Sequence, residues 1–72
     1  MNLEEKLALL EETLECDEGV LKPEMDLNDV DEYDSMSKLS LIVMMEDEFG
    51  VKLTSTDIKA FVTVGDIIAK MN

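Results

Sequence analysis

The sequence predicts an all-α fold, a small four-helix bundle with a long loop between helices one and two and a short third helix. Apolar residues recur at intervals of three and four along separate segments, which is the period of a core-facing helix. Helix-capping motifs stand before three of these segments. No segment shows the alternating pattern of a half-buried strand. A chain of 72 residues is expected to form one domain, residues 1–72, with a small core.

The first helix is expected to begin after Asn2 and to end near Gly19. Asn2 and Glu5 match a variant of the capping box. An apolar stripe follows, formed by Leu3, Leu7, Leu10 and Leu14. From residue 20 to residue 33 the helical period is lost and Pro23 opposes a helix, so we expect a long loop. Apolar residues occur at intervals along this loop and are expected to anchor it to the core: Leu21, Met25, Leu27 and Val30.

The second helix is expected to run from Ser35 to Phe49. Gly50 follows and is able to adopt the left-handed conformation that ends a helix. Residues at intervals of three and four predict the face that packs on the core. These residues are Met36, Leu39, Ile42, Met45 and Phe49.

Two further capping boxes predict the remaining helices. Thr54 with Asp57 begins the short third helix, and Thr63 with Asp66 begins the fourth. The apolar residues after the second of these boxes again follow a helical period. The fourth helix should therefore present to the core Val64, Ile67, Ile68 and Met71.

Ser35 stands at the junction between an acidic loop and the second helix. Residues 24–34 before it carry six carboxylates and no basic residue. A hydroxyl at a helix start is exposed to solvent, close to unpaired backbone N–H groups and at the positive end of the helix dipole. Such a position suits a side chain that carries an anionic phosphate ester. Asp34 is placed to accept a hydrogen bond from the N–H of Met36 or Ser37, as an N-cap does.

Three motifs follow one another along the chain. They are Asp34-Ser35-Met36 at the start of the second helix, MEDEFGV at 45–51 and TVGDIIAKM at 63–71. In this order and spacing they resemble the acyl carrier protein family, over nearly the whole chain. The resemblance implies that Ser35 accepts the 4′-phosphopantetheine arm of coenzyme A, whose thiol carries an acyl or related group as a thioester. It implies a carrier rather than an enzyme, loaded by a phosphopantetheinyl transferase with coenzyme A and Mg²⁺.

Partner enzymes are expected to recognise Asp34, Met36, Val43, Glu46 and Asp47. The resemblance implies this role for Asp34, and an exposed methionine suits contact with several partner surfaces. Simpler explanations remain open for three of these features. Asp34 would serve only as an N-cap, Met36 would lie at the rim of the core, and residues 46–48 would form a solvated face.

The start of the second helix departs from the pattern of many fatty-acid carriers. Those proteins have acidic residues in the first turns after the serine, whereas this chain has Ser37, Lys38 and Ser40. Tyr33 also replaces a residue that is small in fatty-acid carriers. Both departures favour a carrier dedicated to a particular lipid, polyketide or aminoacyl pathway over one that serves the housekeeping fatty-acid enzymes.

The net charge excludes two classes of partner. The chain has 18 acidic residues and six lysines, with no arginine or histidine, which gives a formal charge of −12. Nucleic acid and anionic membranes would be repelled, while enzymes with basic docking patches would be attracted. The chain lacks a long apolar run, so we expect no membrane insertion and take the cytoplasm as its location. We expect a monomer.

Other functions fit the residues less well. An EF-hand beginning at Asp26 fails, because Asp31 stands where glycine is required and Ser37 where glutamate is required. The lone Cys16 forms no disulfide within the chain and, without histidine, no zinc site, so no metal site is predicted. No histidine is present to activate a nucleophile, which disfavours an enzyme. The alternative that stays open is a small acidic helical interaction module with an unmodified Ser35.

Overall fold

The computed structural model describes residues 2–71, and it confirms the all-α prediction. The elements are α1 (Leu3–Leu14), a 3₁₀ turn η1 (Leu27–Asp29), α2 (Ser35–Phe49), α3 (Ser55–Ala60) and α4 (Val64–Ile68). Extended pairing within the described residues is limited to an isolated bridge between Asp26 and Thr63. The fourth helix was expected to reach Met71, but α4 ends at Ile68 and is as short as α3, with five residues against six. The bundle therefore has two long and two short helices.

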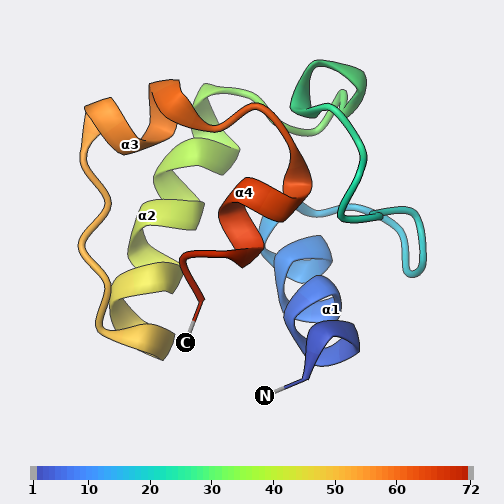
Figure 1. The fold of residues 1–72 in the computed structure, drawn as a ribbon, viewed down its shortest axis with the longest axis horizontal. Helices are drawn as coiled ribbons and strands as arrows, with labels where there is room; N and C mark the ends of the chain where they lie inside the picture. The colour runs from blue at the N-terminus through green and yellow to red at the C-terminus, as the bar shows by residue number, and fades with distance from the viewer. Residues whose placement is uncertain (1, 72) are drawn as a thin grey trace.

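The helices surround one apolar core. The two long helices α1 and α2 run in opposite directions and pack on each other, and α4 packs on α1 (Figure 1). The short α3 lies beside the N-terminal end of α2 (Figure 1). Lys6 on α1 donates a hydrogen bond to the carbonyl of Met71 at 3.2 Å, so the two ends of the described chain are joined. The most deeply buried side chains are Leu10, Leu14, Leu21, Leu41, Met45, Val64 and Ile67.

Helix α1 ends at Leu14, so the prediction of an end near Gly19 was wrong. Asn2 caps its start through the predicted capping box with Glu5. Glu15 then takes the left-handed conformation, with φ of 60°, and donates to the carbonyls of Glu11 and Glu12. Asp17 and Glu18 follow, and negative charge is unfavourable at the negative end of a helix dipole. These acidic residues disfavour extension of the helix beyond Leu14.

Hydrogen bonds and buried apolar side chains attach the loop between α1 and α2 to the rest of the fold at several points. The buried Glu11 carboxylate accepts a hydrogen bond from the N–H of Leu21 at 2.9 Å. Further on, the N–H of Gly65 donates to the carbonyl of Pro23 at 2.8 Å. A Cβ atom at Gly65 would lie 3.0 Å from this carbonyl oxygen, so glycine permits the close approach. The predicted anchors Leu21, Leu27 and Val30 are buried, and Met25 packs against the core.

The buried face of α2 differs from the prediction. Met45 is buried as expected, and Ile42 and Phe49 pack at the edge of the core, but Met36 and Leu39 are exposed. The centre of the face is instead formed by Ser37, Leu41, Met44 and Met45. Apolar residues occur on nearly every side of α2, so more than one helical stripe was available in the sequence. Packing against α1 selects one of them.

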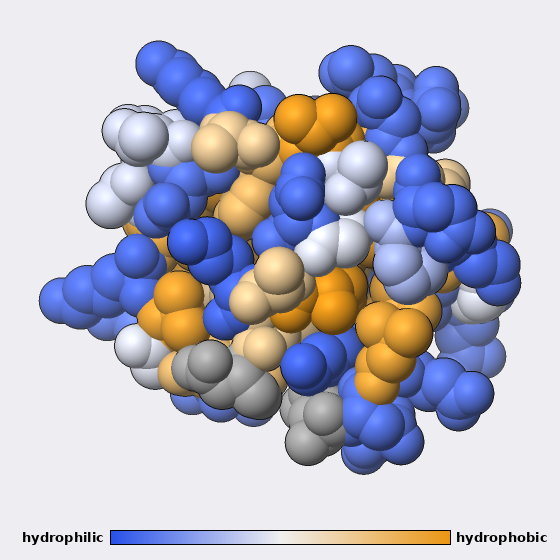
Figure 2. Space-filling view, viewed as in Figure 1, coloured by the Kyte–Doolittle hydropathy of each residue, from blue (hydrophilic) through white to orange (hydrophobic). Residues whose placement is uncertain are grey.

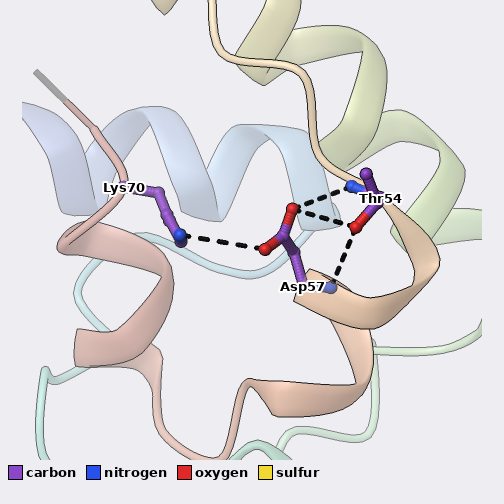
Figure 3. A network of polar contacts seen from close by, with 3 residues as sticks. All are labelled: Thr54, Asp57 and Lys70. Atoms are coloured by element: carbon purple, nitrogen blue, oxygen red, sulfur yellow. Dashed lines mark hydrogen bonds and ion pairs between the residues drawn. The ribbon is translucent and has the colours of Figure 1, made fainter.

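Both short helices begin with the predicted capping boxes. At α3, the N–H of Asp57 donates to Thr54 Oγ1 at 3.3 Å, and the N–H of Thr54 donates to Asp57 Oδ2 at 3.0 Å (Figure 3). Lys70, which follows α4, lies 3.8 Å from the other carboxylate oxygen of Asp57 (Figure 3). At α4, Asp66 accepts from the N–H groups of Val62 and Thr63. Hydrogen bonds at the caps hold these short helices in place.

Candidate functional site

Ser35 is the first residue of α2, and its side chain is exposed. The preceding Asp34 is extended, with φ of −116° and ψ of −172°, so the chain turns sharply into the helix at this point. The first backbone N–H groups of the 15-residue helix lack partners in their own helix and favour an anion. The serine therefore stands where the sequence predicts it, accessible and at the positive end of α2.

Asp34 is the N-cap of α2, as predicted. Its Oδ1 accepts from the N–H of Ser37 at 2.9 Å, and Ser37 Oγ accepts from the N–H of Asp34 at 2.8 Å. The backbone hydrogen bond from Ser37 is the main cause that holds the pKa of Asp34 below its ordinary value. The sequence alone does not predict this role of Ser37, because a capping box usually has glutamate or glutamine at that position. The buried Ser37 hydroxyl is thus a structural group and not a second exposed candidate.

Backbone hydrogen bonds fix the segment that leads into Ser35. The N–H of Tyr33 donates to the carbonyl of the buried Val30 at 3.0 Å, and the N–H of Asp34 donates to Glu32 at 3.0 Å. The Tyr33 side chain is half-buried, and the Lys38 ammonium lies 5.1 Å from the centre of its ring. The serine is therefore presented by an ordered turn.

The exposed face of α2 carries an apolar stripe that begins beside Ser35. Met36 is 74% exposed, Leu39 62% and Val43 59%. Glu46 and Asp47 are exposed farther along the helix. The five predicted recognition residues are thus all exposed, with Asp34 at the helix start. The spacing of Leu39 from Met36 predicts a place in the core, so the sequence does not indicate Leu39 as a recognition residue.

Two connected grooves follow the seam between α1 and α2. The first, of about 260 Å³, lies beside Asp34 and Met36, and the second, of about 530 Å³, continues along Leu39 and Val43. Thr13 on α1 and Ser40 on α2 border both. Most of the surface visible in Figure 2 is hydrophilic, with small separate apolar areas among polar side chains. The lining of the larger groove combines apolar side chains such as Leu39 and Val43 with the acidic Glu12, Asp47 and Glu48.

The other chemical groups in the described residues are inert or structural. Burial, followed by the nearby Glu32, Glu11 and Asp17 carboxylates, raises the pKa of Cys16 to about 11. This thiol stays protonated at neutral pH and is a poor nucleophile. Residues 2–71 hold no group of three or more histidine, cysteine, aspartate or glutamate side chains placed to bind a metal. None of the described helices has the length and apolar character needed to cross a membrane.

Comparison with known proteins identifies the family. A family model described as the phosphopantetheine attachment site matches residues 7–71. The chain belongs to the phosphopantetheine attachment site family. The acyl carrier resemblance and the expected 4′-phosphopantetheine cofactor are thereby confirmed at the level of the family.

Curated relatives of this attachment-site chain are acyl carrier proteins. The chain is 36% identical over 62 residues to the acyl carrier protein of Thermotoga maritima, covering 86% of this chain and 76% of that protein. It is 33% identical over 61 residues to the meromycolate extension acyl carrier protein of Mycobacterium tuberculosis, covering 85% of this chain and 53% of that protein. The chain therefore spans about half the length of the mycobacterial relative. No solved structure gives a significant match.

The geometry around Ser35 fits the prosthetic group of the attachment-site family. In this family the group is joined through a phosphate ester, which requires an accessible hydroxyl. Ser35 offers an exposed hydroxyl at the first position of α2, and a helix N-terminus favours negative charge. The Asp34 carboxylate is engaged by the backbone N–H of Ser37. The relatives' names describe carriers, in agreement with the prediction of a carrier rather than an enzyme.

Proposed function

We propose that this chain is an acyl carrier and that Ser35 bears the 4′-phosphopantetheine arm. The observation that carries the proposal is the exposed Ser35 hydroxyl, at the first position of α2 directly after the Asp34 cap, within a domain of the attachment-site family. When bound, the arm supplies a terminal thiol that holds the cargo as a thioester. The relatives' names support an acyl cargo.

Loading makes use of Ser35 as a nucleophile. Its Oγ would form a phosphodiester bond with the phosphopantetheine phosphorus of coenzyme A, while the phosphoanhydride bond of this phosphorus would break and 3′,5′-adenosine bisphosphate would leave. In this proposal the hydroxyl proton passes to a base on the transferase, since the chain has no histidine to accept it. The low pKa of Asp34, caused first by the Ser37 backbone N–H, makes this carboxylate a poor base. Mg²⁺ brought with coenzyme A would neutralise phosphate charge.

The exposed face of α2 serves partner enzymes. Its apolar stripe, Met36, Leu39 and Val43, gives side chains that a partner can bury, and Glu46 and Asp47 attract basic docking patches. The partners in this proposal are a phosphopantetheinyl transferase and acyl-transferring or synthase enzymes. The stripe starts beside Ser35, so a partner that covers it would also reach the loaded arm.

The pathway in this proposal is a dedicated one for a lipid, polyketide or aminoacyl intermediate. The first turns of α2 after Ser35 lack acidic residues, since the chain has Ser37, Lys38 and Ser40 there. Ser37 is also buried in the cap, so only the other two face partners. Enzymes whose basic patches bind acidic side chains at these positions would associate with this carrier slowly.

Intact-mass measurement tests the proposal. The apo-protein is incubated with a promiscuous phosphopantetheinyl transferase, coenzyme A and Mg²⁺, and we expect the mass of one phosphopantetheine to be added. Ser35→Ala should abolish the addition, while Ser40→Ala, an exposed serine on the same helix, should leave it complete. A wild-type protein that stays unmodified would support the alternative, a small acidic interaction module without a prosthetic group.

A further inference from the structure

Met36 is the only exposed methionine among residues 2–71, with an exposed fraction of 74%. Three other methionines belong to the apolar core and have exposed fractions of 9% or less: Met44, Met45 and Met71. A buried thioether meets reagents in solution only when the fold opens locally, whereas an exposed one meets them at any time. Oxidants therefore reach the sulfur atom of Met36 before those of the core.

The two remaining sulfur atoms in the described part of the chain are less reactive. Met25 is half-buried and packs against the core, and its sulfur accepts a hydrogen bond from the backbone N–H of Lys22 at 3.3 Å. Cys16 is also half-buried, and burial together with nearby carboxylates raises the pKa of its thiol to about 11. Thiols react with peroxides as thiolates, so Cys16 is protected at neutral pH.

The position of Met36 connects its sulfur to the proposed attachment residue. Met36 directly follows Ser35 and begins the apolar stripe of α2 that continues with Leu39 and Val43. It also borders the groove of about 260 Å³ beside Asp34, so there is open space next to its side chain for one further oxygen atom. A chemical change at this sulfur alters the part of the stripe closest to the serine.

We propose that Met36 is a reversible oxidation site and that its sulfoxide slows the docking of partner enzymes at Ser35. The oxidant is a peroxide. The thioether sulfur gives an electron pair to the O–O bond, one oxygen atom joins the sulfur, and the other leaves as water or an alcohol. The effect on docking rests on the proposed function, since it requires partners that bury the stripe.

The sulfoxide is unfavourable in an interface that suits the thioether. A thioether is apolar and adaptable, so a partner surface can bury it without supplying a hydrogen bond. Oxidation converts it into a polar group. Burying such a group without a hydrogen-bond donor is unfavourable, so a partner shaped for the thioether binds the oxidised chain more weakly.

Peroxide treatment of the full-length apo-protein tests the site. The apo-protein has no arm thiol, so the mass of one added oxygen atom comes from the chain itself. Tandem mass spectrometry locates the oxygen, and we expect Met36 to react about tenfold or more faster than the three core methionines. The melting temperature should stay unchanged, because the side chain lies outside the core. Methionine sulfoxide reductases for both sulfoxide epimers should remove the oxygen.

Loading kinetics then measure the effect on docking. After the peroxide is removed, the oxidised apo-protein is incubated with the phosphopantetheinyl transferase, coenzyme A and Mg²⁺. We expect kcat/KM for loading to fall about fivefold or more, a factor that corresponds to about 1 kcal/mol. Reduction of the sulfoxide should restore the value of the untreated protein.

Two variants separate oxidation of Met36 from other effects of peroxide. Met36→Leu is the matched control, because it keeps an apolar side chain of similar size without sulfur. It should be loaded equally well before and after treatment. Met36→Gln places a polar side chain at the same position without oxidation, so it should be loaded slowly even when untreated.

Three results would overturn the inference. Oxygen found on Met25 or on a core methionine before Met36 would show that exposure does not select the site. An oxidised protein that is loaded at the untreated rate would show that the sulfoxide does not hinder docking. An equal loss of loading in peroxide-treated Met36→Leu would assign the effect to another residue. An untreated wild-type protein that gains no phosphopantetheine would instead refute the proposed function, while the oxidation of Met36 would still be read from its mass.

Discussion

Two hydroxyl groups near Ser35 differ in their hydrogen bonding, and this difference predicts opposite effects on stability. Ser37 Oγ accepts from the N–H of Asp34 at 2.8 Å and donates to the Asp34 carbonyl at 3.0 Å. The Tyr33 hydroxyl is shielded from solvent without a partner among the described residues. Ser37→Ala should lower the free energy of unfolding by about 1 kcal/mol, because it removes satisfied hydrogen bonds.

Tyr33→Phe should leave the free energy of unfolding of the apo-protein unchanged or raise it by about 1 kcal/mol, because an unsatisfied buried hydroxyl is unfavourable. Denaturant unfolding of the two variants beside the wild type provides the measurement. If Tyr33→Phe lowers the free energy of unfolding as much as Ser37→Ala does, the tyrosine hydroxyl has a hydrogen-bond partner in the folded chain.

At this scale the sequence identified the central residue of the site but only part of its surroundings. Ser35 and its Asp34 cap were predictable, because helix starts follow local rules. Two features depended on tertiary structure instead. The exposure of Leu39 follows from which side of α2 packs on α1, and a groove lined by Tyr33, Lys38 and Lys59 joins residues that are distant in sequence.

One of the contacts that hold the loop between α1 and α2 involves a buried carboxylate. Glu11 accepts a hydrogen bond from the N–H of Leu21 at 2.9 Å, and both residues are buried. Glu11→Ala should lower the free energy of unfolding by about 1–3 kcal/mol, because it leaves this N–H unpaired. Glu11→Gln keeps an oxygen that can accept this hydrogen bond, so it should lower the free energy of unfolding less than Glu11→Ala does. The control is Glu12→Ala, an exposed neighbour, and an equal loss there would refute the anchoring role.

The carboxylates that cap the short helices predict that the stability of the fold depends on pH. Hydrogen bonds from the N–H groups of Thr63 and Val62 lower the pKa of Asp66. A carboxylate whose folded pKa is below its unfolded value stabilises the fold above the unfolded pKa, about 4, and loses this effect as pH falls through the folded pKa. Asp66→Ala should therefore lower the melting temperature at neutral pH, and the difference from wild type should narrow below about pH 4.

Thermal melts of both proteins from neutral to acidic pH would test this. A difference that stays constant across the range would show that the ionised form of Asp66 has no special role in the cap.

The helix starts were predictable from sequence and the helix ends were less so. All four predicted N-terminal caps are present, because each requires only residues three positions apart. The end of α1 was missed, since Glu15 adopts the left-handed conformation without being glycine. The backbone hydrogen bonds between the long loop and the start of α4 have no signal in local sequence.

At the scale of the whole molecule, the net charge of −12 opposes folding. Like charges on a compact surface repel one another more than they do in an expanded chain. Among residues 2–71 a single ion pair, Lys70 with Asp57, offsets this. Raising the NaCl concentration from about 0.02 M to about 0.5 M, or adding millimolar Mg²⁺, should therefore raise the melting temperature. A melting temperature indifferent to both salts would mean that the carboxylates are spaced widely enough not to interact.

Localising the modification on the loaded protein tests the central claim most directly. The wild-type protein is loaded by a phosphopantetheinyl transferase, digested, and sequenced by tandem mass spectrometry across the peptide that contains Ser35, Ser37 and Ser40. The account predicts a single phosphopantetheine on Ser35, the exposed first residue of α2. Modification of Ser37 or Ser40 with Ser35 left free, or of a serine outside this peptide, would contradict it.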